Sequence, residues 1–156
     1  MFYSTELITP LGTVTLASDG DALCGLWFHG QKYFAASISG AMHQKDGLEI
    51  FGETKNWLER YFTGKRPEIR ELPLRPIGSE FRQNVWKILC EIPYGEVTTY
   101  GEIAQRIADE QGLESMSAQA VGGAVGHNPI SIIIPCHRVV GSDGNLTGYA
   151  GGIEKK

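Results

Sequence analysis

The first third of the chain alternates hydrophobic and polar positions with the two-residue period of β-strands. Three such stretches lie at residues 2–8, 12–18 and 22–28. Turn-forming residues separate them, first at 9–12 and then at 19–21. Strands joined by short turns pair antiparallel, so we predict an antiparallel meander.

The pattern then changes to the 3.6-residue period of helices. Between residues 48 and 62 the apolar side chains can share one broad face, which predicts a helix that ends at Gly64. Residues 64–76 contain three prolines and few helix formers, which indicates an extended linker. We therefore predict a first domain at 1–75 and a second at 76–156.

Helical periodicity returns after the linker. We predict helices over 80–91, from Thr98 or Thr99 to 108, and over 118–125, with Ser79 and Ser117 as further N-caps. The last helix consists almost entirely of small residues. Two short helices around a loop are typical of a helix-turn-helix that enters a DNA groove. On the local pattern alone, tight packing against the segment of Cys136 is the favoured explanation of the small residues.

Composition excludes several classes of protein. The chain has 156 residues, of which 42% are hydrophobic and 21% charged, as in soluble globular proteins. No apolar run approaches the roughly 20 residues of a membrane span, and residues 1–6 lack the layout of a secretion signal. We expect a cytoplasmic protein without a membrane partner.

Charge argues against a protein held to nucleic acid by bulk electrostatics. The net charge is −4, and residues 112–156 carry three basic and three acidic side chains. Any contact with DNA must then rely on shape, helix N-termini and main-chain amides. The three cysteines are odd in number and far apart, and the four histidines lack zinc spacing, so we expect neither disulfides nor a metal.

The most distinctive segment is Ile134-Pro135-Cys136-His137-Arg138-Val139. The apolar run 130–134 predicts a strand that presents Cys136 at a fixed, partly enclosed position. The adjacent imidazole of His137 can draw the thiol proton away and leave the nucleophilic thiolate. Cys24 and Cys90 sit in apolar patterns and are interpreted as inert core thiols. A papain-like hydrolase is disfavoured, since it needs a histidine distant in sequence.

Several segments around Cys136 and earlier in the second domain match the pattern of a known protein family. The segments 93–100, 120–124, 128–129, 134–140 and 148–152 occur in the order and spacing of the O6-alkylguanine-DNA alkyltransferases, which the chain resembles from about Ser79 to Lys156. The resemblance implies an α/β (α+β) fold. A small ribonuclease-H-like N-terminal domain, with an antiparallel sheet plus helix, would precede a mostly helical C-terminal domain with a helix-turn-helix.

The resemblance also implies an activity without cofactors. The protein would bind duplex DNA through the minor groove as a monomer, rotate an O6-alkylguanine (or an O4-alkylthymine) out of the stack, and transfer the alkyl group irreversibly to Cys136. It implies catalytic roles for Cys136, His137, Tyr100 and Asn128, and pocket roles for Val139, Gly148, Tyr149 and Ala150. DNA would be contacted by Tyr100, Ser117, Ala118, Gln119, Ala120, Gly122 and Gly123.

Two departures from the family pattern matter. The family has an arginine in the recognition helix where this chain has Gln119, which predicts weaker DNA binding or slower base extrusion. The family also has a glutamate beyond the paired glycines that orients the histidine, and Glu154 is too close to those glycines for that assignment. Both departures leave open an alternative class, a lesion-binding protein that flips and holds alkylguanine without efficient transfer.

Overall fold

The protein is described by a computed structural model that covers residues 2–30, 35, 38, 42–93 and 96–140. The chain divides into two compact units. The first comprises Met1–Ile77 together with Pro129–Ile133, and the second comprises Gly78–Asn128 together with the chain from Ile134 onward. The boundary inferred from the sequence keeps residues 129–133 in the second domain, whereas their contacts place them in the first unit.

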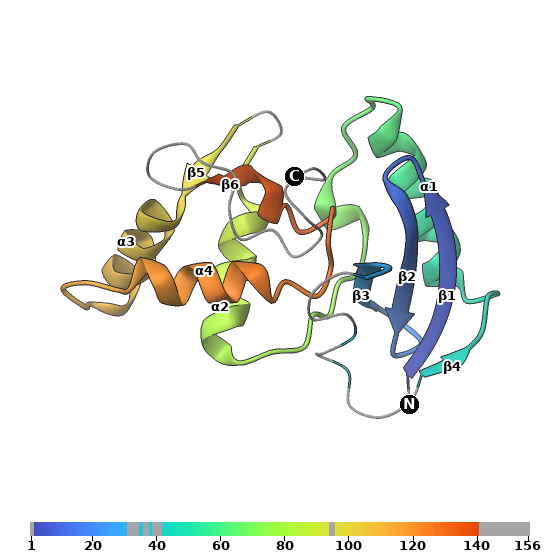
Figure 1. Ribbon diagram of the computed structural model, residues 1–156, viewed down its shortest axis with the longest axis horizontal. Helices are drawn as coiled ribbons and strands as arrows, with labels where there is room; N and C mark the ends of the chain where they lie inside the picture. The colour runs from blue at the N-terminus through green and yellow to red at the C-terminus, as the bar shows by residue number, and fades with distance from the viewer. Residues whose placement is uncertain (1, 31–34, 36–37, 39–41, 94–95, 141–156) are drawn as a thin grey trace. The chain divides into compact units, whose positions relative to one another are not determined.

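The first unit is a four-stranded sheet with one long helix (Figure 1). Strands β1 (Phe2–Thr9), β2 (Gly12–Ser18) and β3 (Leu23–Phe28) form the predicted antiparallel meander. A fourth strand, β4 (Met42–Gln44), pairs parallel to β1, so the sheet order is β3-β2-β1-β4. The predicted antiparallel meander is confirmed, and β4, which the sequence does not predict, makes the sheet mixed. β4 has only three residues, too few to display an alternating pattern.

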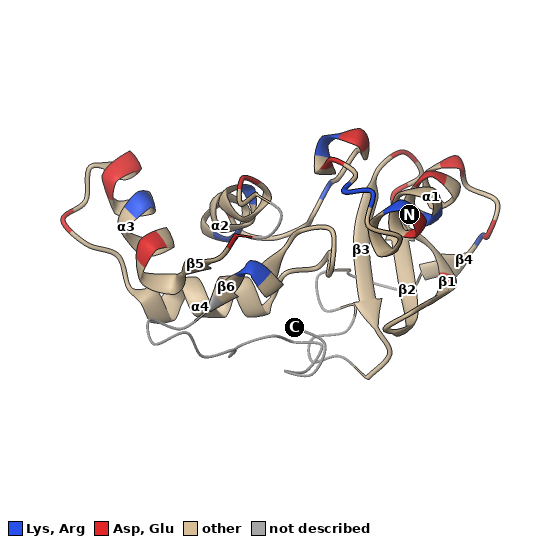
Figure 2. Ribbon diagram, turned by 90° about the horizontal axis from the view of Figure 1, so that it is seen from above, with Lys and Arg blue, Asp and Glu red and all other residues tan. Residues whose placement is uncertain are grey.

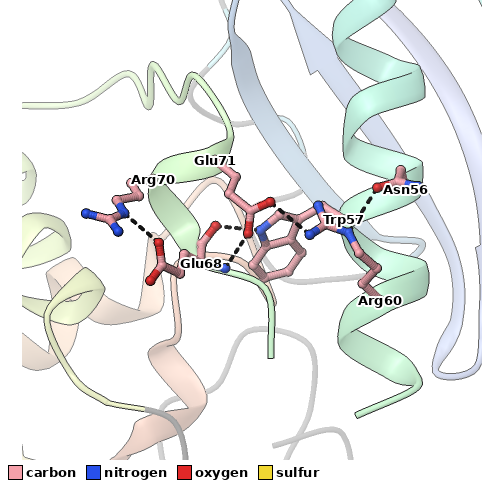
Figure 3. Close-up of polar contacts among 6 residues, drawn as sticks. All are labelled: Asn56, Trp57, Arg60, Glu68, Arg70 and Glu71. Atoms are coloured by element: carbon pink, nitrogen blue, oxygen red, sulfur yellow. Dashed lines mark hydrogen bonds and ion pairs between the residues drawn. The ribbon is translucent and has the colours of Figure 1, made fainter. Parts of the chain in front are cut away.

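Helix α1 (Glu49–Phe62) confirms the prediction for 48–62 and buries Ile50, Phe51, Trp57 and Leu58. The following segment is largely extended, as predicted, with one short 3₁₀ turn, η1 (Ile69–Glu71). The indole of Trp57 donates a hydrogen bond of 2.8 Å to the main-chain oxygen of Glu68, and the carboxylate of Glu71 accepts one from Arg60 (Figure 3). These bonds attach the linker to the helix.

The free edge of β3 is covered by two distant segments of the chain. The main chain of Leu23 bonds Pro73 and Arg75, and the main chain of Leu26 bonds Pro129 and Ser131, at 2.8–3.0 Å. An uncovered strand edge exposes unpaired amides and carbonyls, so this pairing satisfies them. It also fixes where the chain enters the segment that leads to Cys136.

The second unit is mostly helical (Figure 1). It contains α2 (Glu80–Cys90), α3 (Tyr100–Gln111) and α4 (Ala118–Gly126), whose N-terminal amides are bonded by the side chains of Ser79, Thr99 and Ser117. The predicted caps Ser79 and Ser117 are confirmed, and of the two candidates Thr98 and Thr99 it is Thr99 that caps α3. Gly112 ends α3 in the left-handed region, with φ of 69°, which glycine adopts without strain. Among the described helices, none is long and apolar enough to cross a membrane.

Candidate functional site

A short two-stranded ladder fastens the segment of Tyr100 to that of Cys136. Strands β5 (Thr98–Thr99) and β6 (Val139–Val140) pair in parallel, with Thr98 opposite Val139 and Thr99 opposite Val140. Tyr100 follows β5 as the first residue of α3, and the 3₁₀ turn η2 (Cys136–Arg138) directly precedes β6. Two residues that lie 36 positions apart in the sequence are thereby anchored to one ladder.

Cys136 lies in a tight turn and is only 4% exposed. Its main-chain amide donates 2.8 Å to the oxygen of Ile134, and the side-chain amide of Asn128 donates 2.8 Å to the same oxygen. Asn128 is itself buried, at 3% exposure. The side chain of Asn128 therefore clamps the turn that carries the cysteine. The catalytic role that the family resemblance implies for Asn128 stays a prediction.

The structure corrects the local conformation around the cysteine. Residues 130–134 do not form the predicted strand: Ile130 makes an isolated bridge to Leu26, and the chain then turns through Ile132 at φ of 70°. All five residues are buried. A short run that is apolar throughout indicates burial on every side and does not distinguish a strand from a buried turn.

Arg138, two residues after the cysteine, holds the other end of the 3₁₀ turn. Its guanidinium donates 2.5 Å to the main-chain oxygen of Ile92, and its amide donates 3.0 Å to the oxygen of Pro135. Val139 is completely buried, and His137 is half-buried beside it. The turn is thus tied at both ends, so the thiol occupies a defined position.

Helices α3 and α4 form the predicted helix-turn-helix, with a loop at 112–117 between them. The proposed DNA contacts Ser117, Ala118, Gln119, Ala120 and Gly123 are exposed, and Gly122 is half-buried. A β-carbon placed on Gly122 would lie 3.9 Å from the ring of Tyr100. The ring of Tyr100 therefore lies against α4, next to the surface expected to meet DNA.

The exposed part of α4 carries no charge. Figure 2 shows α4 without a single acidic or basic residue, while α3 carries Glu102, Asp109 and Glu110 together with Arg106. Arg106 is paired with Glu91 at 2.6 Å and with Glu110 at 3.1 Å. Direct attraction for phosphate must come from the N-terminus of α4 and not from its side chains.

Of the other two cysteines, Cys24 is buried and Cys90 is half-buried. Burial, and then the charge of Asp19, raises the pKa of the Cys24 thiol. Burial, and then the charge of Glu91, raises the pKa of the Cys90 thiol to about 11. Both thiols stay protonated at neutral pH, which supports their interpretation as inert. The expected place in the core holds for Cys24, whereas Cys90 is half-buried.

Some predicted residues lie outside the described part of the chain, namely Gly148, Tyr149 and Ala150. Conversely, the sequence gives no sign that Trp86 does more than fill the core. It is buried, at 2% exposure, but its indole also donates 2.9 Å to the main-chain oxygen of Ala124 in α4. A buried tryptophan N–H is expected to find an acceptor, yet the sequence gives no signal for which one.

Comparison with known proteins agrees with this geometry. The model of the 6-O-methylguanine DNA methyltransferase ribonuclease-like domain matches residues 2–76, and that of the DNA-binding domain of the same family matches residues 80–156. A methylated-DNA–protein-cysteine methyltransferase of Haemophilus influenzae is 42% identical over 99% of this chain and 82% of its own length. A protein of the same name from Methanosarcina mazei is 44% identical over 95% of this chain and 88% of its own length.

Solved structures agree as well. The crystal structure of the Mycobacterium tuberculosis O6-methylguanine methyltransferase is 41% identical, with a TM-score of 0.82 over 99% of this chain and 88% of that one. The complex of Mycobacterium tuberculosis OGT with DNA has the same TM-score at 40% identity, over 99% of this chain and 86% of that one.

Fold and site together define an α/β protein with a helix-turn-helix and a buried cysteine held in a braced turn. The two family models and the relatives make the assignment specific. The chain belongs to the O6-methylguanine DNA methyltransferase family.

Proposed function

We propose that this protein repairs alkylated DNA directly, by moving the alkyl group of an O6-alkylguanine onto Cys136. The observation that carries the proposal is the turn at Cys136, braced by Asn128 and joined to the segment of Tyr100 by the β5–β6 ladder, within a chain that belongs to this family. A relative named for the same reaction is 42% identical over nearly the whole chain.

The chemistry is a single displacement. The thiolate sulfur of Cys136 attacks the alkyl carbon, a sulfur–carbon bond forms, and the carbon–oxygen bond breaks with its electrons left on the guanine. His137 takes the thiol proton, and the phenol of Tyr100 supplies a proton or a hydrogen bond to the purine as its negative charge develops. The product thioether has no route back to the thiol, so each molecule acts once.

DNA recognition is assigned to the N-terminal half of α4. Ser117, Ala118, Gln119 and Ala120 are exposed there, and none of them is bulky and charged. A helix with such a smooth surface can approach the backbone of a narrow minor groove closely. The target base is rotated into the pocket beside Tyr100 and Val139, and alkylated thymine is proposed as a second substrate of the same pocket.

The number of lesions repaired per protein molecule tests this proposal. With duplex containing O6-methylguanine in excess, we expect repair to stop at one methyl group per molecule, and no repair by Cys136→Ala. Continued turnover would contradict a self-alkylating protein. Binding of the lesion without any repair would favour the lesion-binding alternative.

A further inference from the structure

The indole of Trp86 joins α2 to the C-terminal turn of α4. Its Nε1 donates 2.9 Å to the oxygen of Ala124, and the opposite edge of the ring lies against Gly78, where an added β-carbon would come within 2.5 Å of it. The ring is therefore enclosed on two edges by elements of the second unit. Because Trp86 belongs to α2 and its indole is bonded to α4, this side chain can hold α4 in place relative to α2.

The acceptor is one of the last carbonyls of α4. In an α-helix the oxygen of Ala124 would receive the amide of Asn128, but that amide donates to Val125 at 3.1 Å. The amide of His127 donates to Gly123, also at 3.1 Å. The final carbonyls of a helix need partners from outside, and for Ala124 the partner is the indole of Trp86.

Helix α4 depends on such contacts more than most helices. It has nine residues, and two adjacent glycines, Gly122 and Gly123, lie in its interior. An interior glycine destabilises a helix relative to alanine, and isolated helices of this length are marginal in water. The buried side of α4 offers only Val121, Ala124 and Val125, which give little directional restraint.

We propose that Trp86 is a positioning residue for duplex binding, which acts by fixing the C-terminal end of α4. The inference rests on the proposed function, because α4 presents the surface assigned to DNA. Trp86 itself does not need to touch DNA or the alkylated base.

The chain supplies a matched control in its first unit. Trp57 is equally buried, at 2% exposure, and its indole likewise donates to a main-chain oxygen, that of Glu68, at 2.8 Å (Figure 3). Trp57→Phe and Trp86→Phe remove the same N–H from the same kind of bond. Any difference between the two variants then reports the position of the tryptophan and not the chemical change.

The test compares the two variants by duplex binding and by reaction with the free base O6-methylguanine. We expect Trp86→Phe to weaken binding of unmodified duplex about threefold to tenfold, which is the net value of one hydrogen bond. Reaction with the free base, which does not need α4 as a docking surface, should change less than twofold. Trp57→Phe should leave both quantities within twofold of the wild-type protein.

Hydrogen exchange adds a readout that separates positioning from general stability. Amides of α4 should exchange faster in Trp86→Phe, while those of α1 should not. Equal effects of the two variants on duplex binding, or unchanged binding in Trp86→Phe, would overturn the proposal. If Trp86→Phe does not fold, benzothienylalanine at position 86 retains the shape of the ring without the N–H and takes its place, with the same expected results.

Failure of the positioning role of Trp86 and failure of the proposed function give different results in these experiments. If the wild-type protein transfers no alkyl group, the proposed function fails. The comparison of duplex affinities between Trp86→Phe and Trp57→Phe is still decisive for the positioning role in that case.

Discussion

At the scale of single residues, the thiols of the protein are expected to titrate differently. The pKa of Cys90, raised to about 11 from an ordinary value of 9.0, means that folding favours its neutral form. This contribution to stability is complete below pH 9 and is lost as the pH rises from 9 to 11. We predict that the free energy of unfolding falls over this range, and less steeply in Cys90→Ala. Denaturant unfolding at several pH values measures this free energy. The same dependence on pH in the wild-type protein and in Cys90→Ala would contradict the prediction.

Gln119 lies exposed on α4, the helix to which we assign contact with DNA. Gln119→Arg places a cation on an exposed surface that otherwise carries no charge. We predict about threefold to tenfold tighter duplex binding, with the slope of affinity against salt steeper by about 0.9. Gln111→Arg, at the exposed C-terminal end of α3, adds the same charge elsewhere and is the control. Unchanged or weaker binding by Gln119→Arg would show that α4 is not the DNA-reading helix.

At the scale of elements, the N-cap of α3 links stability to the proposed chemistry. The hydroxyl of Thr99 accepts the amide of Glu102 at 3.1 Å, and Tyr100 is the first residue of the helix that it caps. We predict that Thr99→Ala costs about 1 kcal/mol of stability and also slows alkyl transfer. Ser79→Ala removes the matching cap of α2, at similar cost and without slowing transfer. Thermal unfolding and single-turnover rates compare them, and equal rates in the two variants would count against a role for this cap.

Element by element, the sequence predicts what is local. The caps at Ser79, Thr99 and Ser117 were identifiable because an N-cap depends on residues within one turn. Strand β4 was not, since three residues show no period and their pairing with β1 joins positions about 40 apart. The buried turn at 130–134 was not either, because its conformation depends on the edge of β3 and not on its own residues.

The candidate site divides in the same way. The adjacency of Cys136 and His137 is visible in the sequence, whereas the bond from Asn128 to the oxygen of Ile134 is visible only in the folded chain. The β5–β6 ladder and the bond from Trp86 to Ala124 are pairings between distant residues, which only the folded chain displays.

At the scale of the whole molecule, the division into units is not a division of the sequence into two halves. Pro129–Ile133 belongs to the first unit, where the main chain of Leu26 bonds Pro129 and Ser131. We predict that a fragment of residues 78–156 is less stable than the intact protein and transfers alkyl groups more slowly. Ile130→Ala in the intact chain should cost about 2–5 kcal/mol, since Ile130 is fully buried. A fragment with the melting temperature and rate of the intact protein would refute this view.

The central claim is that the sulfur of Cys136 accepts carbon from damaged guanine. Intact mass spectrometry of the protein after incubation with O6-methylguanine duplex tests it most directly, with peptide mapping to locate the change. We expect a gain of one methyl group at Cys136, and none on Cys24 or Cys90. A folded protein that binds the lesion but whose Cys136 stays unmodified would contradict it.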